Sequence, residues 1–168
     1  MIEVIPRYIM RFFVIVLLQV FIFNNIEISG FINPYIYILF ILLLPFETPA
    51  SIVLLLAFLL GLSVDIFAET IGMHTAATVF IAFLRPFVLK FFAPHDGYES
   101  GSLPRISYFG LPWFLKYTTI LVFCHHMVLF YIEMFRMQDF FFTFFRVILS
   151  TVFTVTFITL SQYFVFRK

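Results

Sequence analysis

The chain has 168 residues, of which 63% are hydrophobic and only 11% are charged, and its mean hydropathy is +1.10. A water-soluble fold of this length cannot bury so much apolar surface, whereas lipid solvates apolar side chains directly. The net charge of +1 excludes a nucleic-acid-binding protein that works through a broad basic field. Composition therefore predicts an all-α, polytopic membrane protein.

Six apolar runs predict a bundle of about six transmembrane helices in one integral membrane domain, residues 1–168. Spanning the hydrocarbon core of a bilayer takes about 20 apolar residues of helix. The first run follows Arg7 and Arg11 without a small-residue cleavage site, so we expect an anchor and not a cleaved signal. In chain order the expected spans are 8–23, 31–46, 49–67, 73–92, 113–135 and 140–166. The second is short, so we expect it to tilt little or to thin the bilayer locally.

The distribution of basic residues predicts the orientation. An even number of spans places both termini on the same side of the membrane. That side holds Arg7, Arg11, Lys90, Arg105, Arg167 and Lys168, whereas the opposite loops offer Arg136. The positive-inside rule then places both termini and the main polar loop, 93–112, in the cytoplasm.

A polar stretch near the end of the third span carries the candidates for helix packing or partner docking. If that helix continues, Gly61, Asp65 and Glu69 share one face, because residues four apart are neighbours. Gly61 would let another helix approach closely, and Gly72 would end the helix with a positive φ. His74, expected at the outer edge, could pair with Asp65 or Glu69. The alternatives are a solvated turn, a structural anchor of the turn, and a proton relay or substrate contact. The candidate residues are Gly61, Leu62, Asp65, Glu69, Gly72 and His74.

Two further sets of ionisable residues lie within the expected spans. We expect Arg85 to extend its side chain to the cytoplasmic interface near Lys90. Glu133 and Arg146 lie at similar depths on adjacent antiparallel helices, which predicts an intramembrane ion pair.

The sequence predicts no catalytic, cofactor-binding or metal-binding residues. Cys124, His125 and His126 are consecutive, and consecutive helical residues point about 100° apart, so they cannot converge on one ion without other ligands. A haem between His74 and His126 would need matching depths. Glycine-rich phosphate loops, nucleophile elbows and paired catalytic carboxylates are missing from the sequence. We therefore expect a non-enzymatic protein.

The run Gly61-Leu62-Ser63-Val64-Asp65, followed by Gly72 and an apolar fourth span, resembles the MreD family of rod shape-determining proteins, in its Bacteroidetes-like version. Chain length and the close spacing of the second and third spans are similar too. The resemblance implies a non-catalytic membrane scaffold of the cell-elongation machinery, which maintains cell shape by docking partners of peptidoglycan synthesis. The implied partners are an MreC-like bitopic membrane protein, the MreB filament, a SEDS glycosyltransferase and a penicillin-binding transpeptidase, besides the lipid bilayer, with no nucleic acid.

The family also resembles, in fold, the substrate-binding membrane subunits of energy-coupling-factor vitamin transporters. A subunit of that kind is the alternative function, and it would need convergent polar residues in an outward-facing cavity and a stripe of small residues on its first helix. The first span is bulky throughout residues 12–18, which favours the scaffold. A membrane-embedded enzyme is a third class, which would need a converging polar cluster.

Overall fold

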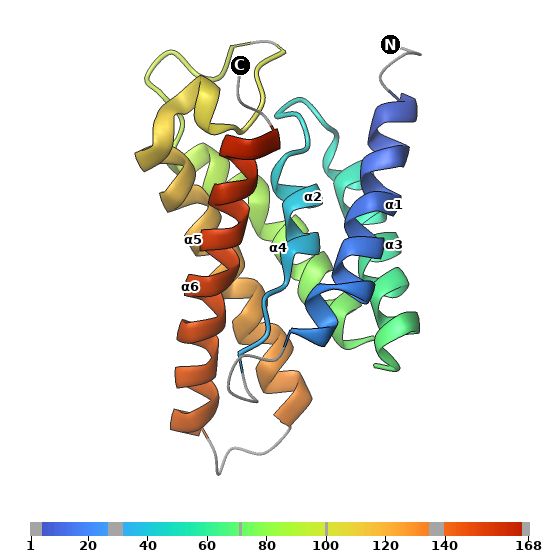
Figure 1. Ribbon diagram of the computed structural model, residues 1–168. Coiled ribbons are helices and arrows are strands. Elements are labelled where there is room, and N and C mark those ends of the chain that lie inside the picture. The colour runs from blue at the N-terminus through green and yellow to red at the C-terminus, as the bar shows by residue number, and fades with distance from the viewer. Residues whose placement is uncertain (1–4, 27–31, 71, 100, 135–139, 166–168) are drawn as a thin grey trace.

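The protein is a bundle of long helices around one broken segment, as seen in a computed structural model (Figure 1). The structure describes residues 5–26, 32–70, 72–99, 101–134 and 140–165. Its long helices are α1 (Ile5–Phe21), α3 (Ala50–Ala68), α4 (Met73–Phe91), α5 (Ile106–Met134) and α6 (Phe140–Val165). Between α1 and α3 lie the 3₁₀ turns η1 (Phe23–Asn25) and η2 (Ile36–Ile38) and the short helix α2 (Leu39–Leu42). Five helices are long and apolar enough to cross a membrane, which confirms an all-α, multi-pass membrane protein.

The second expected span, 31–46, is not a transmembrane helix. Residue 31 lies outside the described residues, residues 32–35 are non-helical, and η2 and α2 together supply only seven helical residues. We call residues 32–44 the broken segment. It runs between the long helices from one end of the bundle towards the other (Figure 1). Extended chain rises about 3.3 Å per residue against 1.5 Å in an α-helix, so the broken segment covers more distance than a helix of the same number of residues.

The start of α1 and the end of α6 lie at the same end of the bundle (Figure 1). We call this the loop end, because it also holds the loop 92–105, and we call the opposite end, with the turn 69–72, the turn end. The main loop is shorter than the expected 93–112, because α5 already begins at Ile106. The helix is interrupted at Gly110, whose φ of 77° and ψ of 166° are not helical. Arg136, Arg167 and Lys168, named in the orientation argument, lie outside the described residues.

The loop at the loop end is packed onto the bundle by aromatic side chains. The ring of Tyr98 stacks on Phe46 with centroids 4.0 Å apart, and its hydroxyl donates to the carbonyl of Leu89 at 2.7 Å. Burial raises the pKa of Tyr98 to about 12, so the phenol stays neutral over the physiological range. The indole of Trp113 donates to the carbonyl of Phe92 at 3.0 Å.

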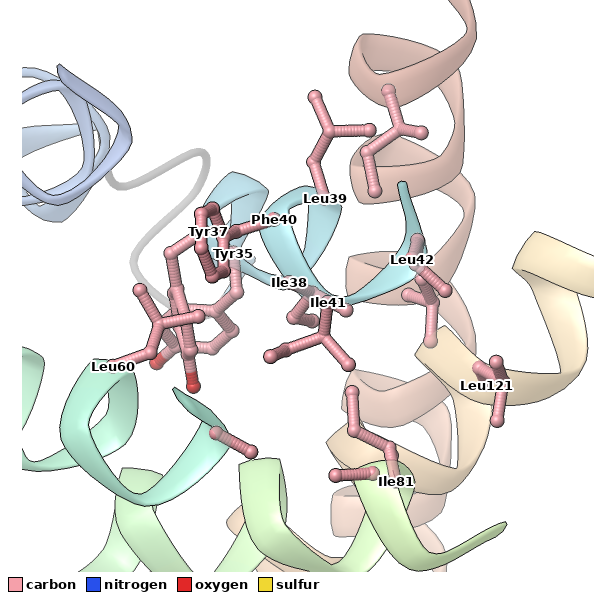
Figure 2. Packing of buried hydrophobic residues seen from close by; sticks show 14 of the residues in the cluster. Tyr35, Tyr37, Ile38, Leu39, Phe40, Ile41, Leu42, Leu60, Ile81 and Leu121 are labelled. Atoms are coloured by element: carbon pink, nitrogen blue, oxygen red, sulfur yellow. The ribbon is translucent and has the colours of Figure 1, made fainter. Parts of the chain in front are cut away.

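The broken segment is the centre of the hydrophobic core. Residues 34–44 are all buried. The helix α1 packs on α3 and η2, each of α3, α4 and α5 packs on the next long helix, and α6 also reaches η2. Figure 2 shows Ile38 and Ile41 among side chains from three of these helices, Leu60 of α3, Ile81 of α4 and Leu121 of α5. Non-helical backbone at membrane depth is tolerated only when protein surrounds it, as it does here.

The outer faces of the helices are apolar. Phe13 of α1, Phe87 of α4 and Phe141 of α6 are 59%, 60% and 86% exposed. Exposed apolar patches of this extent mark a surface in contact with lipid or with another protein.

Candidate functional site

Gln19 of α1 holds the start of the broken segment. Its side chain is fully buried, and its Oε1 accepts hydrogen bonds from the backbone N–H groups of Ile36 at 2.8 Å and Tyr37 at 3.2 Å. Its Nε2 donates to the carbonyl of Pro34 at 3.2 Å and to Oδ1 of Asn24 at 2.9 Å. One amide therefore pairs three backbone groups that have no helical partner. In hydrocarbon each of them would otherwise cost several kcal/mol.

Two hydroxyl groups of α6 pair the neighbouring backbone. Ser150 Oγ accepts from the N–H of Asn33 at 3.3 Å, and Thr154 Oγ1 accepts from the N–H of Tyr35 at 3.1 Å. The Thr154 hydroxyl also lies 3.3 Å from Nε2 of His126. Nδ1 of His126 donates to a carbonyl one turn earlier in α5 at 2.7 Å, so Nε2 accepts the proton of Thr154. His126 thereby orients a hydroxyl that holds the broken segment.

Arg85 holds the other end of the segment. Its guanidinium is buried and donates to the carbonyls of Leu44 and Pro45, and its Nε donates to the hydroxyl of Tyr117 at 3.1 Å. Tyr117 in turn donates to the carbonyl of Leu42 at 3.0 Å. The expectation that Arg85 reaches the cytoplasmic interface is wrong, because the carbonyls beyond α2 offer the cation partners inside the bundle.

A buried cluster of rings lies beside η2. The hydroxyl of Tyr37 is 3.0 Å from Nδ1 of His74 and 2.7 Å from Nε2 of His125. Nδ1 of His125 is buried without a partner among the described residues. An orphaned lone pair is more common in proteins than an orphaned N–H, so His125 carries its proton on Nε2 and donates to Tyr37. Tyr37 then donates to Nδ1 of His74, which leaves the proton of His74 on Nε2.

Asp65 caps the start of α4. Its Oδ1 accepts from the N–H of His74 at 3.0 Å and the hydroxyl of Thr70 at 2.7 Å. Its Oδ2 accepts from the N–H of Thr75 at 2.9 Å and from the Thr75 hydroxyl at 2.6 Å. A carboxylate in this position satisfies unpaired N–H groups of the first turn and interacts favourably with the helix dipole. The carboxylate ties α3 to α4 within the chain.

Gly61 lies where α3 and α4 touch. A Cβ atom at this position would lie 2.5 Å from Cα of Thr75 and 2.9 Å from the carbonyl oxygen of His74. Only glycine permits this approach, so Gly61 packs against the chain's own fourth helix.

The remaining candidates of this stretch are separated by the end of α3. The helix ends at Ala68, and Glu69 adopts a left-handed conformation with φ 55°, so Glu69 does not share the face of Gly61 and Asp65. Gly72 has a positive φ of 76°, but it directly precedes α4 instead of ending α3. Leu62 is exposed on the outer face of α3. His74 lies in the first turn of α4 at the turn end, and its ring is buried against Tyr37.

Glu133 and Arg146 are brought together across α5 and α6. Nη1 of Arg146 lies 3.1 Å from Oε2 of Glu133. The guanidinium also lies 4.2 Å from the ring centroid of Phe130, a cation–π distance. The side chain of Arg146 is 12% exposed and that of Glu133 is 40% exposed. Their ion pair links the adjacent helices α5 and α6.

A polar cavity of about 400 Å³ lies at the turn end, which we call the turn-end cavity. The end of α1, the broken segment, the turn before α4 and the end of α5 all line it. The polar groups along its wall belong to Asn24, Asn25, Asn33, Tyr35, Thr70, His74 and Glu133. Within the part of the chain that the structure describes, no three His, Cys, Asp or Glu side chains form a metal site.

A second hollow, of about 440 Å³, lies between α1 and α3 towards the loop end, and we call it the α1–α3 groove. Phe40 and Leu44 of the broken segment form part of its wall, together with Phe12 and Phe13 of α1. Ile52, Leu56 and Leu59 of α3 form the other side. The groove is almost wholly apolar and is flanked by the exposed faces of both helices.

Comparisons of the chain with protein-family models, curated proteins and solved structures found no match. Several residues of the structural centre were missed by the sequence analysis, namely Gln19, Tyr35, Tyr37 and Tyr117. The sequence did contain a signal. Pro34 lies near the start of the second apolar run and indicates backbone that cannot be fully helical, and Gln19 in the first run is a polar side chain that could pair such backbone.

Proposed function

We propose that the protein is a non-catalytic membrane scaffold of the bacterial cell-elongation machinery, as its resemblance to the MreD family implies. The observation that carries this proposal is the use of the polar side chains at membrane depth. Gln19, Arg85 and Thr154 are bonded to the backbone of the broken segment, and Asp65 to the start of α4. Groups engaged in this way hold the fold and are not available for chemistry on a substrate.

The α1–α3 groove is the docking surface in this proposal, and its occupant is the single transmembrane helix of an MreC-like bitopic partner. Helices associate in lipid through close van der Waals packing, which a groove between two helices provides. Phe40 and Leu44 of its wall are themselves buried in the core, at 5% and 3% exposure, so the packed core lies behind the groove. The helix α1 is also the least buried of the five long helices, since only 17% of its apolar stretch is buried inside the bundle. It therefore has an open face for a partner.

The proposed orientation places the loop end in the cytoplasm of an inner-membrane protein. Arg7, Arg11, Lys90 and Arg105 lie at or near this end, whereas the described loop residues of the turn end, 22–26, 32–35, 69–70 and 72, include no lysine or arginine. Positively charged flanks stay in the cytoplasm. The loop 92–105 would then face the MreB filament, and the turn end would face the site of wall synthesis with its SEDS glycosyltransferase and transpeptidase.

Depletion in the source cells tests the proposal. Rods are expected to round up, and the protein is expected to co-purify with the MreC-like partner. Tryptophan at Ile52 or Leu59 fills the groove and should abolish both rescue of shape and co-purification. Tryptophan at Phe58, which is exposed on a different face of α3 and does not line the groove, is the matched control. Normal shape after depletion, or full rescue by the groove variants, would contradict the proposal.

A substrate-binding subunit of a vitamin transporter is the second candidate. The turn-end cavity favours it, since polar groups converge there in a volume within the usual range for small-molecule sites. The bulky first helix argues against it. A specific nutrient requirement with unchanged cell shape after depletion would select this candidate.

A further inference from the structure

We propose that the turn-end cavity binds a small, uncharged ring compound that carries both hydrogen-bond donors and acceptors. The site does not depend on the α1–α3 groove, so it goes beyond the scaffold function and can be tested separately. It is the cavity that favours the second candidate function, and the proposal names the class of ligand that this cavity would take.

The first observation is the imidazole of His74. The side chain is 4% exposed and lines the cavity. Its Nδ1 is bonded to Tyr37, and the tautomer derived above leaves the proton on Nε2. Nε2 has no hydrogen-bond partner among the described residues. This N–H is not fully buried, so it is open to the cavity that His74 lines and can donate to a molecule bound there.

The second observation is that the other polar groups of the wall have fixed, mixed roles. Asn24 uses its oxygen to accept from Gln19, so its Nδ2 is a donor for the cavity. Asn25 uses its nitrogen to donate to the carbonyl of Phe21, so its Oδ1 is an acceptor. A ligand that satisfies His74, Asn24 and Asn25 must therefore both accept and donate hydrogen bonds.

The third observation concerns charge and shape. Glu133 is the one described carboxylate of the wall, and its Oε2 is paired with Arg146. Its Oε1 remains as a further acceptor, but the charge is balanced, which disfavours a charged ligand. The side chains of Phe23, Phe67 and Tyr35 also line the cavity and give it apolar, aromatic surface that a ring compound can contact. Heterocyclic amides and monosaccharides share the required chemistry.

The experiment measures thermal unfolding of the full chain in lipid nanodiscs by fluorescence of its single tryptophan, Trp113, which lies at the loop end away from the cavity. The probes are uracil, hypoxanthine and lumichrome as heterocyclic amides, and glucose and N-acetylglucosamine as sugars. At least one of them is expected to raise the Tm, with a rise that grows with probe concentration. Choline and phosphate serve as charged probes and are expected to leave the Tm unchanged.

Variants separate binding in the cavity from general effects. Asn25→Leu and Glu133→Gln each remove one acceptor and should abolish the Tm shift, whereas Glu99→Gln, in the exposed loop at the other end, should keep it. A Tm shift with the heterocyclic amides alone, or with the sugars alone, shows which of these two classes of compound the cavity binds. No shift with any uncharged probe, a shift only with a charged probe, or a shift that survives both cavity variants would overturn the proposal. Loss of ligand binding leaves partner docking in the groove untouched, so the two failures are distinguishable.

Discussion

Replacement of Gln19 by leucine should destabilise the protein far more than the same replacement at Gln162. Both glutamines are buried, at 0% and 4% exposure, so both substitutions exchange a buried amide for a similar apolar volume. They differ in their bonds. Gln19 pairs the carbonyl of Pro34 and the N–H groups of Ile36 and Tyr37, whereas Nε2 and Oε1 of Gln162 have no partner among the described residues.

The magnitude follows from the groups left unpaired. A buried donor or acceptor that loses its partner costs about 1–3 kcal/mol, so Gln19→Leu should cost at least about 3 kcal/mol for three backbone groups. In a chain of this size 1 kcal/mol lowers the Tm by about 2–4 °C, which gives a loss of about 6–12 °C or more. Gln162→Leu removes a buried amide that pairs with none of the described groups, so its Tm should stay the same or rise.

Tryptophan fluorescence of both variants during heating in the same detergent measures the difference. Circular dichroism before heating checks that both variants fold. Equal losses of Tm in the two variants would refute the reasoning, because they would show that the amide of Gln19 does not hold the broken segment.

Three further substitutions test the other contacts within the bundle. Gly61→Ala places a methyl group against the backbone of Thr75 and should cost about 1–3 kcal/mol, measured as a lower Tm. Asp65→Asn weakens the cap of α4 by about 1–2 kcal/mol and should increase hydrogen exchange at the first turn of that helix, which unchanged exchange would contradict. Exchange of Glu133 and Arg146 should restore the Tm lost in either single charge reversal, and failure of the double variant to recover would show that the pair does not link α5 to α6.

The five long helices were predictable because their signal is local. Each is a run of apolar residues, and the expected spans 49–67 and 73–92 differ by one residue at most from the ends of α3 and α4. The second span was mispredicted as a helix, because hydropathy cannot distinguish an apolar run that faces lipid from one that is enclosed by other helices. The partners that permit a broken segment lie on α1 and α6, more than a hundred residues away in the case of Thr154.

The sequence analysis singled out most of the important polar residues, but it predicted the contacts of only some of them. Glu133 and Arg146 lie as expected from their depths on adjacent helices. The predicted position of the Arg85 side chain was wrong, because the prediction assumed that this side chain faces lipid. In the structure it points into the bundle and donates to a carbonyl of the broken segment. His74 and His125 are both bonded to the hydroxyl of Tyr37, and a contact between three elements leaves no local pattern in the sequence.

Photo-crosslinking in growing cells tests the central claim, that the α1–α3 groove docks a partner's transmembrane helix. A photoreactive residue is placed at Ile52 or Leu59 in the groove, and at Phe58 on another face of the same helix as a control. We predict that the groove positions capture a bitopic membrane protein with a large domain outside the cytoplasm, and that the control does not. Capture of lipid alone at the groove positions, or equal capture of that protein from Phe58, would contradict the claim.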